Sequence, residues 1–185
     1  MARLAVLYSS KTGQTLKIAA CIADRLRTAG HTVDLHDAGD PPSAEQLTRI
    51  DGVVIGSWVR GGRHIPAVKR FVESNRELLG RVPSAFFSVS LLQLSTRPTS
   101  RTRAAGYLTG FLARTGWQPT LTASFAGAML YTRLGWLGRR IERAAWRKEG
   151  IDSDITRDHE FTRWEEVDRF ADEFARAMGR AAPSL

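Results

Sequence analysis

Short apolar segments of strand length alternate along this chain with longer segments whose apolar residues recur at helical spacing. The first predicted strand, Leu4–Tyr8, is followed by an amphipathic helix over residues 14–29. We expect further strands at 31–36, 51–56, 84–89 and 121–129, and further helices at 66–79, 103–115 and 162–178. Because parallel strands need crossover connections, this alternation predicts an α/β fold with a doubly wound, five-stranded parallel sheet.

A loop rich in hydroxyl groups joins the first strand to the first helix, with the sequence Ser9-Ser10-Lys11-Thr12-Gly13-Gln14-Thr15. Gly13 permits close approach to the backbone, and the helix N-terminus behind it presents unpaired N–H groups with a partial positive charge. The glycine-rich fingerprints of P-loops and dinucleotide-binding turns are absent. Hydroxyl donors suit the oxygens of a terminal phosphate monoester, so the loop predicts a phosphate site. The alternative is an ordinary turn with Thr12 as the helix cap.

In a doubly wound sheet, ligands bind outside the carboxyl ends of the strands, where the winding direction reverses. The loops 57–65 and 90–101 should therefore line one crevice with the phosphate loop. A flat heteroaromatic ring would fit between their aromatic, glycine, guanidinium and small polar groups, which include Trp58, Val59, Arg60, Gly61, Gly62, Arg63, Ser90, Leu91, Leu92 and Gln93. His64 is either a proton or hydrogen-bond donor near that ring or a solvent-facing histidine. The basic run 97–103 could touch a ligand, but such a run is more often a solvated loop.

The composition limits which partners and which kinds of site we expect for this chain. With 27 Lys and Arg against 19 Asp and Glu, the net charge of +8 favours a polyanion, an anionic membrane surface or an acidic small molecule. Cys21 is the single cysteine and the four histidines lack metal-ligand spacing, so we expect neither a disulfide nor a metal site. The sequence contains no run of about 18 apolar residues, so we expect no helix that spans a membrane. We expect one domain over residues 1–185, in the cytoplasm.

The segment from about 130 to 158 is too long for a simple loop. Its apolar residues recur at helical spacing, at Leu134, Leu137, Ile141, Ala144 and Ala145. A basic face accompanies them, together with Trp136 and Trp146, and consists of Arg139, Arg140, Arg143, Arg147 and Lys148. Three interpretations remain open: the helix packs on the domain through its Leu/Ile stripe, it lies on an anionic lipid surface, or its arginines receive carboxylates of a ligand.

The phosphate loop resembles that of the flavodoxin superfamily, whose Ser/Thr-x-Thr-Gly-x-Thr pattern is present at residues 10–15. Within the superfamily, the chain is most similar to the flavodoxin-type, menaquinone-dependent protoporphyrinogen IX dehydrogenases of bacteria. The likeness covers nearly the whole chain and includes Val54-Ile55-Gly56, Arg60 with Gly62, Pro83–Phe86, Ala126-Gly127-Ala128 and Phe161–Val167. It implies the strand order 2-1-3-4-5, with the basic helical segment 130–158 inserted after the fifth strand.

The resemblance further implies an FMN-dependent oxidation of protoporphyrinogen IX to protoporphyrin IX in haem biosynthesis. Electrons would pass to menaquinone or another membrane quinone, and the enzyme would lie peripherally on the inner face of the cell membrane. Carried over residue by residue, Ser9–Thr15 would bind the phosphate. The flavin ring would be enclosed by Trp58, Val59, Arg60, Gly61 and Gly62 together with Ser88, Val89, Ser90, Leu91 and Leu92. The chemistry would belong to the flavin, with Arg60 and His64 as the candidate assisting residues.

This chain departs from the family pattern around the flavin ring. The family tends to have a small residue at Trp58, an aromatic at Gly61, a histidine near Ile65 and an asparagine at Ser90. We therefore expect Trp58 to stack on the ring in place of the missing aromatic side chain.

Two other classes of function compete with the dehydrogenase. A flavodoxin-like electron carrier or an NAD(P)H:quinone reductase would use the same cofactor, although electron-carrying flavodoxins are typically acidic and this chain is basic. A nucleic-acid-binding protein would use the positive charge, but the basic residues form no recognisable recognition module. The sequence therefore favours the dehydrogenase, with no nucleic-acid partner.

Overall fold

A computed structural model describes residues 1–151 and 154–181 of the chain. Its main sheet is parallel, with the order β2-β1-β3-β5-β6, and the short strand β4 pairs antiparallel with β3. The strands are β1 Arg3–Ser9, β2 Thr32–Asp37, β3 Gly52–Arg60, β4 Arg63–His64, β5 Ser84–Val89 and β6 Leu121–Phe125. Because β4 lies off the main path, this order is the predicted 2-1-3-4-5, and the prediction of a flavodoxin-like doubly wound sheet is confirmed.

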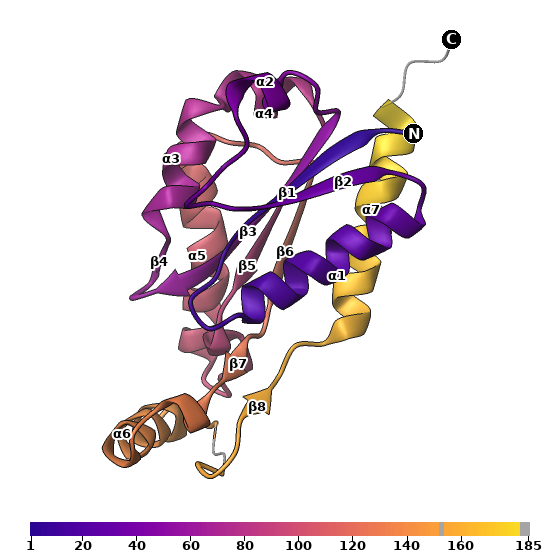
Figure 1. Cartoon of the computed structure of the whole chain (residues 1–185). Coiled ribbons are helices and arrows are strands. Elements are labelled where there is room, and N and C mark those ends of the chain that lie inside the picture. Colours follow the sequence, from indigo (N-terminus) through magenta and orange to yellow (C-terminus); the bar gives the residue numbers. More distant parts are fainter. Residues whose placement is uncertain (152–153, 182–185) are drawn as a thin grey trace.

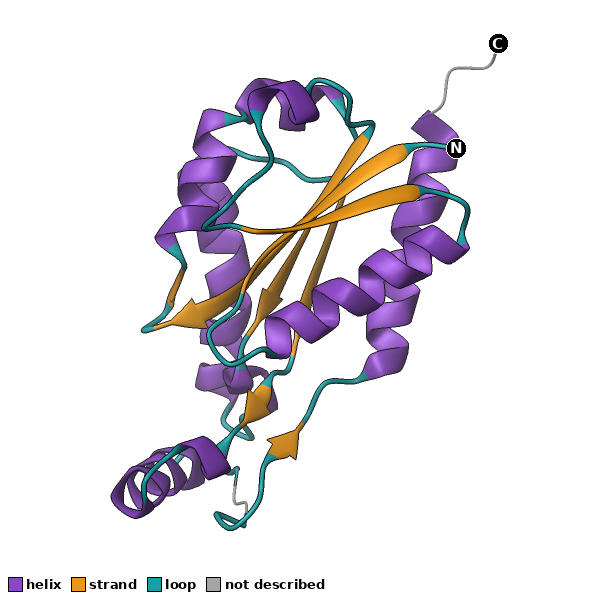
Figure 2. Ribbon diagram, viewed as in Figure 1, coloured by secondary structure: helices purple, strands orange, loops and turns teal. Residues whose placement is uncertain are grey.

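Helices cover both faces of the sheet (Figure 1, Figure 2). One face carries α1 (Gln14–Thr28) and α7 (Trp164–Ala181). The other face carries α2 (Ala44–Leu47), α3 (Pro66–Ser74), α4 (Arg76–Arg81) and α5 (Pro98–Thr115). Within the described residues, no helix combines the length and the apolar composition needed to cross a membrane.

An apolar core lies on each face of the sheet, and both cores follow from the alternation of side chains along the strands. In β1, Leu4 and Val6 pack toward α1 and α7, whereas Ala5 and Leu7 pack toward α3 and α5. All four side chains are buried. A strand that is buried on both faces is mostly apolar, as in the central residues Leu4–Leu7 of β1, Val53–Ile55 of β3 and Ala85–Phe87 of β5.

β3 continues past Gly56, where the sequence predicted its end, as far as Arg60. It then turns through Gly61 (φ 53°) and Gly62 (φ 80°) into β4, so that Arg60 pairs with Arg63. Two central residues with positive φ form the type of turn whose twist matches a β-hairpin, and glycine adopts this conformation at little cost. The segment 57–65, expected to be a loop, therefore contains a β-hairpin.

The helices predicted over 66–79 and 103–115 differ in extent from those observed. The helix predicted over 66–79 is interrupted at Asn75, whose side-chain amide donates to the carbonyl of Phe71 at 2.8 Å. Asparagine competes for backbone partners in this way and so tends to end helices. The helix predicted from residue 103 begins at Pro98, because proline is suited to the first helical position. Most of the run 97–103 is thus helical.

The last predicted strand, 121–129, divides into β6 and a short strand β7 (Ala128–Met129). β7 pairs antiparallel with β8 (His159–Glu160), which brings the two ends of the inserted segment together. The helix predicted from Thr162 begins two residues later, because α7 starts at Trp164. The Thr162 hydroxyl instead donates to the carbonyl of Ala126 at 2.8 Å.

Candidate functional site

A pocket of about 590 Å³ lies at the carboxyl ends of β1, β3 and β5, as expected for a doubly wound sheet. Its position matches the crevice predicted from the three loops. The predicted site residues that line it are Lys11, Thr12, Gln14, Thr15, Trp58, Val59, Arg60, Gly61, Val89, Ser90 and Leu91. The structure therefore brings the proposed phosphate and ring segments together in one cavity.

Other predicted site residues lie next to this pocket without lining it: Ser9, Ser10, Gly13, Gly62, Ser88 and Leu92. Several of them shape the backbone around it. The Ser10 hydroxyl accepts a hydrogen bond from the Gly13 N–H at 3.0 Å and thereby closes the turn before α1. Ser88 and Leu92 are buried.

The N-terminus of α1 has the features of an anion site. The residue before the helix is Gly13, with a φ of 94°, and no side chain caps the first turn. The alternative with Thr12 as the cap is therefore wrong. The first turn contains no acidic residue, and Lys11 lines the adjoining pocket. Uncapped N–H groups next to an ammonium group favour an anionic ligand such as a phosphate.

The ring-binding side of the pocket is built from two adjacent strands. Trp58 pairs in register with Val89, and both residues line the cavity. Trp58 is half-buried and packs against the core beneath α1 and α7. Beyond β5, the Ser90 hydroxyl accepts a hydrogen bond from the Leu92 N–H at 3.2 Å, which starts the short helix η1 (Leu91–Leu94). This wall is therefore mostly apolar, with an aromatic surface at Trp58.

His64 lies in neither of the two places considered for it. It is only 6% exposed, and its ring contacts Phe86 and Phe111 at centroid distances of 5.1 and 5.0 Å. Burial lowers the pKa of His64 to about 4, and the positive charge of Arg114 acts in the same direction. It is a core residue beneath the hairpin and does not line the pocket. His64 was expected in a loop, but it lies in β4, where it pairs with Val59 of the extended β3. In that strand position its side chain is buried in the core.

The inserted segment supplies a wall of the pocket that the sequence did not reveal. Its elements are β7, η2 (Tyr131–Arg133), α6 (Trp136–Arg147) and β8, with a small apolar core around Met129, Tyr131 and Ile151. The pocket residues missed as site candidates are Gly127, Ala128, Met129, Leu130, Tyr131, Arg133, Leu134, Glu142 and Trp146. Gly127 and Ala128 belong to the Ala126-Gly127-Ala128 motif shared with the family, and that motif could have identified them as pocket residues.

Hydrogen bonds attach this segment to the domain. Arg133 Nη1 donates to the carbonyl oxygen of Thr12, in the phosphate loop, at 3.1 Å. Within the segment, the Asp158 carboxylate accepts bonds from the backbone N–H and the hydroxyl of Thr132, each at 2.8 Å, and these bonds hold the pKa of Asp158 below its usual value. The phosphate loop and the insertion are therefore directly linked.

The four arginines predicted to meet substrate or membrane, Arg139, Arg140, Arg143 and Arg147, are not among the pocket-lining residues. The Arg139 guanidinium is directed to the carbonyls of Leu134, Ile155 and Thr132, at 2.9, 3.4 and 3.5 Å. No residue of α6 is buried, and its most exposed apolar side chains are Trp136 (73%), Leu137 (55%) and Ile141 (61%). The interpretation in which Leu137 and Ile141 pack on the domain is therefore wrong.

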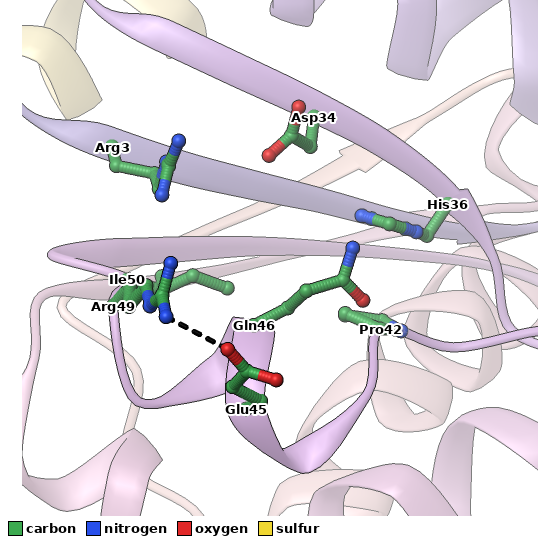
Figure 3. Close-up of a pocket in the computed structure, with 8 residues that line it drawn as sticks. All are labelled: Arg3, Asp34, His36, Pro42, Glu45, Gln46, Arg49 and Ile50. Atoms are coloured by element: carbon green, nitrogen blue, oxygen red, sulfur yellow. Dashed lines mark hydrogen bonds and ion pairs between the residues drawn. The ribbon is translucent and has the colours of Figure 1, made fainter.

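A second, smaller hollow of about 200 Å³ lies between the edge strand β2 and α2 (Figure 3). Its lining includes Asp34, His36 and Gln46, and Arg49 pairs with Glu45 at 2.7 Å. None of the predicted site residues reaches this hollow. It is at the edge of the sheet and away from the strand ends that face the larger pocket, which therefore remains the candidate site.

Comparisons with known proteins point to one family. Residues 5–155 match the model of the flavodoxin domain. The chain is 33% identical over 174 residues to a protoporphyrinogen IX dehydrogenase [quinone] of Escherichia coli K12, covering 92% of this chain and 93% of that protein. It is 31% identical to the protein of the same name from Leishmania major, covering 96% and 76%. A flavodoxin structure from the domain Archaea shares the fold at a TM-score of 0.56, with 13% identity, covering 96% and 99%.

Proposed function

Because the chain belongs to the flavodoxin family, on the branch of the quinone-dependent protoporphyrinogen IX dehydrogenases, we propose that it oxidises protoporphyrinogen IX to protoporphyrin IX. FMN would be its cofactor and menaquinone or another quinone its electron acceptor. The observation that carries the proposal is the pocket itself, which joins an uncapped helix N-terminus to an apolar, aromatic slot. That combination suits a cofactor with a terminal phosphate and a flat ring.

The residues of this pocket fit FMN. The N–H groups at the start of α1 and the ammonium group of Lys11 would hold the phosphate. Trp58, Val89 and Leu91 would contact the ring. When bound, FMN supplies the two-electron redox chemistry of each step.

The remaining side chains would bind and shield the substrate. Tyr131, Leu134 and Trp146 close the pocket on the side of the insertion and would exclude water from the reacting carbon. His64 takes no part in proton transfer in this proposal, because it is buried beneath the hairpin and outside the pocket. Arg60 would contact flavin or substrate from the end of β3.

We place the enzyme on an anionic membrane surface, where a quinone would be available. The support is α6, which exposes Trp136, Leu137 and Ile141 beside the exposed Arg140 and Arg147. An apolar edge flanked by cations is suited to an interface with anionic lipid. The inner side of the same helix contributes Glu142 and Trp146 to the pocket, so such contact would bring the pocket close to the bilayer.

An anaerobic assay tests the proposed function. Protein reconstituted with FMN is mixed with protoporphyrinogen IX and a quinone, and porphyrin fluorescence is followed. We expect porphyrin to form only when both flavin and quinone are present. Flavin reduction by NAD(P)H without porphyrin formation would favour a quinone reductase or an electron carrier, and a chain that binds no flavin would contradict all three functions.

A further inference from the structure

The pocket presents positive charge from three separate elements. Lys11 comes from the phosphate loop, Arg60 from the end of β3, and Arg133 from η2 in the insertion. Much of the remaining surface is apolar or aromatic, and among the residues that the structure describes, Glu142 is the one acidic residue in the lining. The Glu142 carboxylate already accepts a hydrogen bond from Trp146 Nε1 at 2.9 Å. A flat apolar ligand with anionic groups at its edge matches this distribution.

These three cations have different neighbours. Lys11 lies in the turn that leads to the N-terminus of α1, and that helix end is where a phosphate would bind. Arg60 is held by the hairpin, in which it is paired with Arg63. Arg133 donates one N–H to Thr12, and a guanidinium group has five N–H donors. Arg60 and Arg133 are therefore available to a second anionic ligand beside the phosphate.

The arginines of α6 are not placed to bind an anionic ligand inside the pocket. None of them lines the pocket, and the guanidinium of Arg139 is bonded to backbone carbonyls. A carboxylate bound by Arg140 or Arg147, which are exposed on α6, would not draw its ring into the cavity. The residues that bind substrate carboxylates are therefore expected among those that line the pocket.

We infer that Arg60 and Arg133 bind the two propionate carboxylates of the tetrapyrrole and so orient its ring in the pocket. This inference rests on the proposed function. Guanidinium groups bind carboxylates through paired, charge-assisted hydrogen bonds, which fix direction as well as affinity. Arg60 and Arg133 are thus the residues that select a dicarboxylic tetrapyrrole over an uncharged one.

Equilibrium binding tests this assignment without requiring turnover. FMN-loaded protein is titrated with protoporphyrin IX and with its dimethyl ester, in which both carboxylates are masked. We expect the parent protein to bind the diacid at least tenfold more tightly than the ester. Arg60→Gln and Arg133→Gln should each weaken diacid binding about tenfold and leave ester binding unchanged. Arg63→Gln is the matched control, because Arg63 is the exposed partner of Arg60 in the hairpin and does not line the pocket.

Other outcomes would overturn the assignment. A parent protein that binds diacid and ester equally has no carboxylate receptor. Equal losses for diacid and ester in Arg133→Gln, together with weaker FMN binding, would make Arg133 only a support of the phosphate loop. If the preference for the diacid is present and is lost in both variants while the parent produces no porphyrin in the anaerobic assay, the carboxylate site stands and the proposed function fails.

Discussion

Gln14 and Thr162, which lie at opposite ends of the chain, form a buried hydrogen bond beside the pocket. Gln14 Nε2 donates to the Thr162 hydroxyl at 2.9 Å, and that hydroxyl donates onward to the carbonyl of Ala126 at 2.8 Å. Gln14 is the first residue of α1 and lines the pocket. The bond therefore fixes the start of α1, where we propose that the phosphate binds, against the segment that leads into α7.

Thr162→Val should destabilise the protein and weaken FMN binding. Valine keeps the shape of threonine but leaves the buried Gln14 amide and the Ala126 carbonyl without this partner. We expect the free energy of unfolding to fall by about 1–3 kcal/mol, measured by urea denaturation of the FMN-free protein. Thr102→Val, which removes an exposed hydroxyl bonded within α5, is the matched control. Equal stabilities for the two variants would contradict the prediction.

The stability of the protein should depend on pH through His64. Its pKa is about 4 in the folded protein and 6.5 when unperturbed, so the unfolded chain binds more protons between these values. The stabilisation from the neutral, buried ring is therefore complete above pH 6.5 and declines as the pH falls toward 4. The full loss is about 3 kcal/mol. His64→Leu should flatten this part of the stability profile, measured by denaturant unfolding at several pH values.

The control for this experiment is His36→Asn, because His36 is half-buried on the edge strand β2. That variant should retain the parent's decline of stability between pH 6.5 and 4. A parent-like decline in His64→Leu would show that other groups cause it.

Local patterns were sufficient to predict the sheet and the crevice at its strand ends, which the loop after β1 lines. The period-2 and period-3.6 repeats identify the strands and helices, and the winding rule then brings three loops to one edge. The hairpin at Gly61-Gly62 was missed, although two glycines between residues of strand character are a known hairpin signal. That omission also misplaced His64, because one more strand residue decides which face a side chain occupies.

The orientation of α6 could not be predicted from its periodicity. Helical spacing shows which residues share a face, but the surrounding chain decides which face is covered. Here Trp146 and Glu142 face the pocket, whereas Leu137 and Ile141 remain exposed. The expectation that the apolar stripe turns inward holds for a helix on a globular core, and α6 lies outside the two cores of the sheet.

Trp58→Ala should increase the fluorescence of bound FMN several-fold without weakening its binding. Trp58 lines the ring side of the pocket, and an indole stacked on a flavin quenches its emission. The measurement is the emission of protein-bound FMN under saturating protein. Trp136→Ala is the control, because Trp136 is 73% exposed on α6 and does not line the pocket. Identical quenching in Trp58→Ala and the parent would show that Trp58 does not contact the ring.

Leu137→Gln and Ile141→Gln should weaken binding to anionic vesicles, because they remove exposed apolar surface from α6. Co-sedimentation with phosphatidylglycerol vesicles measures the effect, and vesicles of phosphatidylcholine alone should bind the parent poorly. Arg140→Gln should reduce affinity about fivefold, near 1 kcal/mol per basic residue at an anionic surface. Leu16→Gln is the matched control, since Leu16 is 37% exposed on α1. Equal losses for Leu16→Gln and Leu137→Gln, or parent binding unaffected by lipid charge, would rule out α6 as the membrane contact.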